Sequence, residues 1–275
     1  MVEDAPASPI GVASGRREVR SMRSANEKPP WKDLPALQGS IEQEFIRPVH
    51  LGATLLPFRL LEPWLGVIPW DGTTLLEGID PRIDLYPGLA DWWTRAESVW
   101  DDNKGESHLT LLERIDYRRG LSLQFPTPRH RVLYTGSGQY LAAARLDDSR
   151  AVIDTKLYWA TASSLAEARY LAAILNSPAL TRLVAPMQSR GEHNPRDFHK
   201  VVWRLPIALF EPDNDQHRRL ADLAAQAEVV AASVDVSGHR TFQAQRRLIR
   251  EELDRCGVAA VTDAIVCDLL HAGGE

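Results

Sequence analysis

The sequence has few cysteines and no long apolar run, and these two absences exclude several protein classes. Only Cys256 and Cys267 occur among 275 residues, so neither a disulfide framework nor a site of paired cysteines around a metal is expected. No apolar segment approaches the ~20 residues that span a bilayer. The first residues lack the basic and apolar regions of a secretory signal. We therefore expect a cytoplasmic protein with no membrane partner.

The chain also lacks an excess of positive charge, but its charges are unevenly distributed. The formal net charge is −5, which is unusual for a general nucleic-acid binder. Residues 62–102 carry nine acids and two bases, a net charge of −7. Residues 113–131 and 182–204 each carry five bases against two acids, a net charge of +3 in each segment. These two basic segments are candidates for contact with an anionic partner, and charges scattered over a solvated surface are the alternative.

The first part of the chain predicts a tail followed by strands. Residues 1–40 are rich in Pro, Ser, Gly, Arg and Glu, with few large apolar side chains before Trp31, so we expect a flexible N-terminal tail. Residues 41–70 contain short apolar runs broken by Pro and Gly, which is typical of strands and turns. Residues 131–160 repeat this pattern around turns at 135–138 and 147–148, and they predict a meander of short strands.

Helical patterns lie on both sides of these strands. Residues 87–104 place three tryptophans at helical spacing, and a core-packing face is favoured over base stacking. Ser164 and Glu167 form a capping box that begins a helix ending near Asn176. We expect an α+β fold: a β-rich domain with flanking helices over residues 41–212, then a C-terminal helical region over residues 213–275.

Two segments resemble catalytic or cofactor motifs, but each lacks a feature that the motif requires. Adenine-N6 methyl transfer uses Asp or Asn before Pro-Pro-aromatic, because the side chain must accept from the adenine amino group. Lys28-Pro29-Pro30-Trp31 places a lysine there, which can only donate. The pair Gly136 and Gly138 precedes a return strand instead of the helix that a cofactor loop needs. We therefore expect no catalytic residue and no cofactor in this chain.

The most polar segment is 188–200. A metal site there would use His193, Asp197 and His199, but their spacing fits no familiar ligand set. A DNA site is the second interpretation, because Arg pairs with guanine, Asn with adenine, and Lys and His with phosphate. A solvated loop is the third. Together with the other basic segment, the candidate DNA contacts are Arg118, Arg119, Arg129, Arg131, Arg190, Asn194, Arg196, His199 and Lys200.

Three segments in a fixed order then suggest a family. They are Tyr170–Ser177 (YLAAILNS), Phe198–Ile207, whose strand ends in Leu-Pro-Ile, and Asn214–Ala224, a helix start with a His and a Leu-Ala pair. In this order and spacing they resemble the target-recognition region of type IIG restriction–modification enzymes and related adenine-N6 DNA methyltransferases. Type I specificity subunits share a looser version. Upstream, Phe45–Val49 and Leu56–Phe58 resemble the junction that follows the catalytic domain in those enzymes.

The resemblance covers roughly residues 41–232 and implies a DNA sequence-recognition module with a helical spacer. It implies double-stranded DNA as one partner, and as the other a methyltransferase catalytic domain or subunit that binds S-adenosylmethionine. The catalytic domain of the full enzymes has no counterpart before residue 41, so we expect a separate subunit, a split or truncated gene, or a C-terminal piece. Two alternatives stay open. One is a divergent S-adenosylmethionine-dependent methyltransferase using Lys28–Trp31, and the other is an interaction subunit whose helices in residues 214–271 dock a partner without touching DNA.

Overall fold

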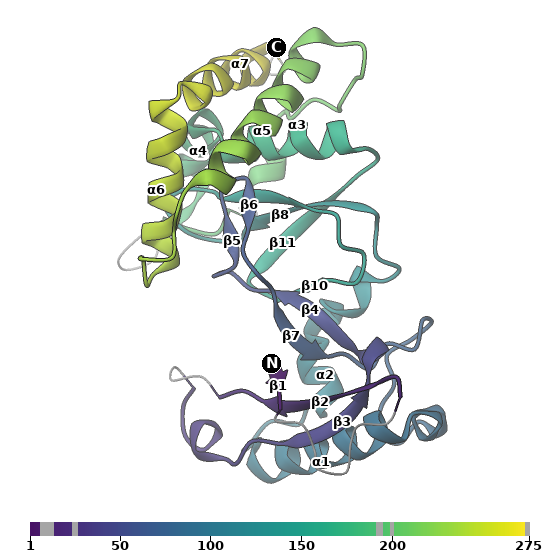
Figure 1. Cartoon of the computed structure of the whole chain (residues 1–275). Helices are drawn as coiled ribbons and strands as arrows, with labels where there is room; N and C mark the ends of the chain where they lie inside the picture. Colours follow the sequence, from purple (N-terminus) through teal and green to yellow (C-terminus); the bar gives the residue numbers. More distant parts are fainter. Residues whose placement is uncertain (6–13, 24–26, 191–194, 199–200, 273–275) are drawn as a thin grey trace. The chain divides into compact units, whose positions relative to one another are not determined.

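The computed structural model describes the chain except residues 6–13, 24–26, 191–194, 199–200 and 273–275, and it has the expected α+β fold (Figure 1). The chain forms two compact units. Unit 1 contains Met1–Val49, Trp64–Thr127 and Arg150–Val152, and unit 2 contains His50–Pro63, Pro128–Ser149 and Ile153–Glu275. The units interleave along the sequence, so boundaries at residues 40 and 212 do not separate them. The expected division is corrected accordingly.

Unit 1 is built around a sheet that includes the N-terminal residues. Among the described residues the sheet has six strands in the order β10-β4-β7-β1-β2-β3. The strands are β1 (Val2–Asp4), β2 (Arg16–Ser21), β3 (Gln38–Glu42), β4 (Ile46–His50), β7 (Trp64–Val67) and β10 (Val152–Ile153). Strand β2 pairs antiparallel with both β1 and β3. The expected flexible tail is therefore wrong for these strands, because Val2 and Val19 are buried and anchor short segments whose composition is otherwise polar.

The helix with the tryptophans covers this sheet. Helix α1 (Pro87–Asn103) packs on β3, and Trp92 and Trp93 are 5% and 3% exposed. The core-packing interpretation of this helix is confirmed for both side chains. The Glu42 carboxylate accepts from the N–H groups of Gly88 and Leu89 at 2.9 and 2.8 Å, which satisfies donors in the first turn of α1. Short helices complete the unit: η1 (Trp31–Asp33), η2 (Gln43–Phe45), η3 (Pro81–Leu85), α2 (Leu111–Ile115), η4 (Tyr117–Arg119) and η5 (Ser122–Gln124).

Unit 2 contains the predicted meander. Strands β8 (His130–Thr135), β9 (Ala143–Leu146) and β11 (Leu157–Ala162) form an antiparallel sheet in the order β11-β8-β9, and β5 (Leu55–Leu56) and β6 (Arg59–Leu60) form a hairpin. The predicted turn around Gly136 is confirmed as the connection from β8 to β9. Strand β10, which we expected in the same meander, instead joins the sheet of unit 1.

Helices cover one face of the β8–β9–β11 sheet and pack on each other (Figure 1). They are α3 (Leu165–Asn176), α4 (Pro178–Val184), α5 (Asp215–Ser233), α6 (Phe242–Arg255) and α7 (Val258–Ala272). The helical C-terminal region is confirmed, but it shares one core with the sheet. Ile174 of α3, Leu220 of α5 and Val266 of α7 are at most 2% exposed in the same cluster. Much of the apolar stripe of the C-terminal helices is therefore used within the unit. None of the helices in the described part of the chain has the length and hydropathy needed to cross a membrane.

The predicted N-cap of α3 is also confirmed. The Ser164 hydroxyl accepts from the Glu167 N–H at 3.1 Å. The Glu167 carboxylate accepts from the N–H of Ser163 at 2.6 Å, one residue earlier than the capping box predicts.

The segment after α4 differs from the expectation of a strand. It contains η6 (Ala185–Met187), the two-residue strands β12 (Ser189–Arg190) and β13 (Pro195–Arg196), and η7 (Val202–Arg204). No strand is assigned to the described part of 198–207. Phe198 and Val202 turn into the core instead, and the Phe198 N–H donates to the Gly136 carbonyl at 2.8 Å. The following residues are held by a side chain, since the Tyr170 hydroxyl donates to the Ala208 carbonyl at 3.0 Å.

Candidate nucleic-acid interface

Two successive arginines in unit 1 adopt a backbone conformation that is rare for residues with side chains. Arg118 and Arg119 have φ of 56° and 61°, in the left-handed region. Asp116 holds this turn, because its carboxylate accepts from the N–H groups of Leu121 and Ser122 at 2.9 and 2.7 Å. The nearest carboxylate in sequence is thus used by the backbone and does not neutralise the arginines. Strained residues of this kind cluster at functional sites.

We use the name arginine turn for Arg114, Arg118 and Arg119. All three side chains are exposed, and within the described residues none makes an ion pair or a side-chain hydrogen bond. The Arg118 guanidinium lies 5.3 Å from the centre of the Tyr117 ring, which is itself 45% exposed. This geometry leaves three guanidinium groups and an aromatic ring available to an outside partner.

Two other arginines of the same unit are neutralised by carboxylates. Arg82 pairs with Asp80 at 2.5 Å and with Asp71 at 3.1 Å, and Arg95 pairs with Asp91 at 2.6 Å. Both belong to the acidic segment 62–102. The arginine turn therefore differs from these two arginines in having no acidic partner among the described residues.

The two arginines predicted next along the chain lie in unit 2 and differ from each other. Arg129 is exposed, and in the described part of the chain it has no ion pair. Arg131 lies in β8, is 0% exposed, and donates to the Asp148 carbonyl at 2.9 Å. Burial lowers its pKa to about 10. The prediction of Arg131 as a DNA contact is therefore wrong, since a fully buried guanidinium in the central strand of a sheet cannot meet a phosphate or a base edge.

The structure gives only the backbone for part of the second basic segment. Strands β12 and β13 pair antiparallel, which brings Arg190 and Arg196 into one hairpin. Asn194, His199 and Lys200 lie outside the described residues, as does His193 of the alternative metal site. Arg182 at the start of this segment is neutralised by Asp263 at 2.8 Å. Arg204 at its end is exposed and forms no ion pair with any described residue.

The helix end at residues 170–177, the first segment of the resemblance, has a structural role. The side-chain amide of Asn176 makes three hydrogen bonds: it accepts from the Ala143 N–H at 2.9 Å and donates to the carbonyls of Ala143 and Ala172 at 2.8 and 2.9 Å. The Ser177 hydroxyl donates to the Asp263 carboxylate at 2.6 Å. These bonds fix the end of α3 to β9 and the start of α4 to α7.

The third segment of the resemblance has a similar role. Asn214 caps α5 by accepting from the N–H groups of Gln216 and His217. The His217 ring is 2% exposed, accepts from the Glu211 N–H at 3.0 Å, and lies 4.7 Å from the Tyr170 ring. The residues that carry the resemblance thus maintain the fold of unit 2, and their side chains are committed within it.

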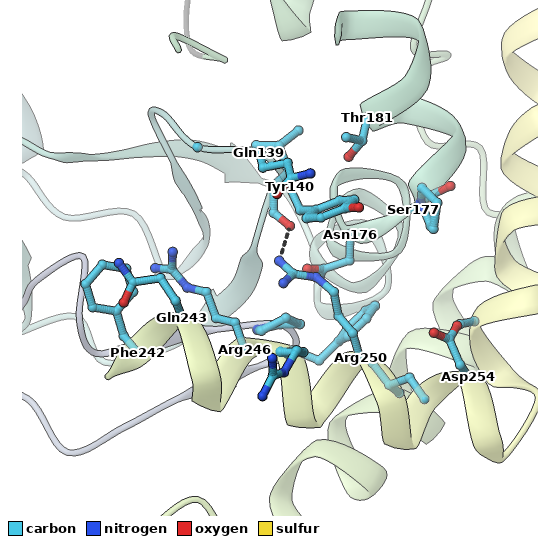
Figure 2. Close-up of a pocket in the computed structure, with 18 of the residues that line it drawn as sticks. Gln139, Tyr140, Asn176, Ser177, Thr181, Phe242, Gln243, Arg246, Arg250 and Asp254 are labelled. Atoms are coloured by element: carbon cyan, nitrogen blue, oxygen red, sulfur yellow. Dashed lines mark hydrogen bonds between the residues drawn. The ribbon is translucent and has the colours of Figure 1, made fainter. Parts of the chain in front are cut away.

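Unit 2 also contains a cavity of about 940 Å³ that the sequence did not indicate (Figure 2). Its wall comes from the loop at residues 137–141, the α3–α4 junction, the length of α6 and the start of α7. Figure 2 shows Arg250 reaching from α6 toward Tyr140 and Asn176. The only sequence signal for this site was the spacing of Arg246 and Arg250, four residues apart on one helix face, which also occurs on ordinary solvated helices.

The alternative enzymatic motif is packed against its own unit. Trp31 stacks on Trp100 of α1 with ring centroids 5.4 Å apart, so one face of its ring is already covered. Over the described residues, no group of three His, Cys, Asp or Glu side chains could hold a metal ion. No protein-family model and no curated protein matches the sequence.

Proposed function

We propose that this protein is a sequence-recognition module for double-stranded DNA, in which exposed arginines contact the duplex. The observation that carries the proposal is the arginine turn, whose three guanidinium groups are exposed and have no acidic partner among the described residues. Arginine pairs bidentately with phosphate and with the guanine edge, so this geometry suits both backbone and base contacts. Arg129 and Arg204 of unit 2 add two exposed cations that form no ion pair with a described residue.

The backbone of the arginine turn supports the same proposal. A left-handed conformation is disfavoured for arginine, whereas glycine adopts it freely. Arg118 and Arg119 nevertheless stand at the two strained positions, and Gly120 follows them with an ordinary negative φ of −66°. Retaining two long cationic side chains where stability favours glycine points to a use outside the fold.

We further propose that the module works with a methyltransferase catalytic domain or subunit that binds S-adenosylmethionine and modifies adenine. This part rests on the three segments between residues 170 and 224 that resemble target-recognition regions. Because their side chains are committed to the fold of unit 2, they support a shared architecture, and they do not identify the bases that are read.

The proposal is tested by selecting from a library of randomised duplexes with the full chain at moderate salt and sequencing the retained DNA. We expect a short enriched motif and an affinity that falls steeply with salt, because each neutralised phosphate releases counterions. Retention without an enriched motif contradicts the recognition function. Absence of retention at low salt contradicts DNA binding altogether and favours the interaction subunit.

A further inference from the structure

Three arginines of α6 line the cavity of unit 2, and two of them, Arg246 and Arg250, donate to backbone carbonyls. Arg246 is 9% exposed and donates to the carbonyls of Leu55 and Gly52 at 2.9 and 2.6 Å. Arg250 donates to the Leu141 carbonyl at 3.0 Å, the bond drawn in Figure 2. The arginines are therefore held rigidly, and each keeps N–H groups that no described residue accepts from.

The charges of this pair have no acidic partner among the described residues. Neither arginine forms an ion pair with a described residue, and the only acidic side chain of the cavity wall is the exposed Asp254. Burial, and then the charge of Arg250, lower the pKa of Arg246 to about 10. Burial also lowers the pKa of Arg250, although Tyr140 and Asp254 oppose the shift. Two like charges close together in a partly desolvated wall are unfavourable until an anion joins them.

The remainder of the wall suits a planar group attached to that anion. Tyr140 is 48% exposed, and its ring lies 5.2 Å from the Arg250 guanidinium. Gln139 and Gln243 are exposed on the wall and offer amide donors and acceptors of the kind that pair with base edges. The cavity volume of about 940 Å³ lies in the usual range for small-molecule sites and far exceeds the needs of a bare phosphate ion.

We infer that this cavity binds a nucleoside monophosphate, either free or as the phosphorylated end of a single strand, with its phosphate at Arg246 and Arg250 and its base on Tyr140. A phosphate supplies the negative charge that the pair lacks, and the bidentate guanidinium geometry matches its oxygens. Stacking on a tyrosine tolerates any base, because every base has a π-face. The site is independent of the proposed binding of double-stranded DNA.

Calorimetry on the full chain tests this inference with four probes: adenosine 5′-monophosphate, adenosine, inorganic phosphate and a 5′-phosphorylated single-stranded oligonucleotide. We expect the monophosphate to bind more tightly than adenosine and than inorganic phosphate, because each of these lacks one half of the ligand. If the oligonucleotide binds more tightly than the monophosphate, the natural ligand is a phosphorylated strand end. If the monophosphate binds more tightly than the oligonucleotide, the natural ligand is a free nucleotide. No binding of either one, or binding of the monophosphate no tighter than that of inorganic phosphate, overturns the inference.

Three variants give matched tests. Arg250→Gln should weaken binding of the monophosphate by roughly tenfold or more, since it removes a charge-assisted hydrogen bond. Tyr140→Ala is an exposed change that keeps the fold, and it should weaken the monophosphate roughly tenfold while leaving inorganic phosphate unchanged. Arg255→Gln, on the same helix but outside the cavity wall, should change neither. Equal affinities of Arg250→Gln, Tyr140→Ala and the unaltered chain for the monophosphate would contradict the inference.

Discussion

Replacing both Arg118 and Arg119 by glycine separates function from stability, because DNA affinity should fall while the free energy of unfolding should not. At φ of 56° and 61° each arginine is held in the left-handed region, which costs roughly 1–2 kcal/mol for a side chain with a Cβ. Glycine relieves this cost but loses about 0.5–1 kcal/mol through the greater freedom of the unfolded chain. The free energy of unfolding should therefore stay unchanged or rise by up to about 3 kcal/mol for the pair.

The same variant should lose DNA affinity in a salt-dependent way. Each phosphate contact contributes about 0.9 to the slope of log affinity against log salt concentration, so two lost contacts should reduce the slope by about 1.8. Fluorescence anisotropy with a labelled duplex over a salt series measures the slope, and urea denaturation measures the stability. Arg82→Gln with Arg95→Gln is the matched control, because both arginines lie in the same unit and are already paired with carboxylates.

Three results would each contradict part of this reasoning. An unchanged salt slope in the glycine variant means that the arginine turn does not contact DNA. A slope reduced equally in the control means that affinity follows the total charge of the unit and not the unpaired guanidinium groups. A loss of more than about 1 kcal/mol of stability contradicts the account of backbone strain instead.

Three further changes test the fold. Asn176→Ala should lower the free energy of unfolding by about 1–3 kcal/mol in urea, because it removes the acceptor of the Ala143 N–H in β9, while the Ala143 carbonyl keeps its bond from the Phe58 N–H; a loss below about 0.5 kcal/mol contradicts this. Burial, and then the charge on Arg131, lower the His50 pKa to about 4. Below pH 6.5 the unfolded chain therefore binds a proton that the folded chain does not, and the free energy of unfolding should fall by about 3 kcal/mol as pH decreases from about 6.5 to 4. His50→Gln should abolish this pH dependence. Matching pH profiles for this variant and the parent chain rule that origin out. Gly88→Ala should destabilise unit 1 by about 1–3 kcal/mol, since a Cβ would lie 2.3 Å from the Ser40 carbonyl oxygen, whereas Gly238→Ala meets open space and should have little effect in thermal melts.

Local patterns were sufficient where neighbouring residues decide the structure. The helix over residues 87–104, the N-cap at Ser164 and the turn near Gly136 were all predicted, because periodicity, capping and turn chemistry act over a few residues. The strand expected over residues 198–207 failed for a non-local reason. Phe198 and Val202 are recruited into the core of unit 2, which outweighs the extended preference of the local sequence.

The candidate site residues also divide into those that the local sequence predicts and those that depend on the tertiary structure. The sequence correctly placed Arg118, Arg119 and Arg129 on the surface, but it also included Arg131, which its strand buries. Charge counts along a segment cannot separate exposed from buried arginines, because burial depends on which strand becomes central in the sheet. The arginines of the cavity could not be predicted from the sequence, because their partners are far away along the chain. Arg246 and Arg250 lie together in the cavity wall only because the fold brings the carbonyls of residues 52, 55 and 141 within hydrogen-bond distance of α6.

The sequence by itself determined the α+β class, the helical C-terminal region and the basic segments, since composition and periodicity are properties of the chain alone. Only the tertiary structure decided that β1, β2 and β3 build a sheet from a segment that reads as a tail. It also decided which arginines are neutralised, exposed or buried. Strand pairing and ion pairing join residues far apart in sequence, and their energies depend on distances that no local pattern contains.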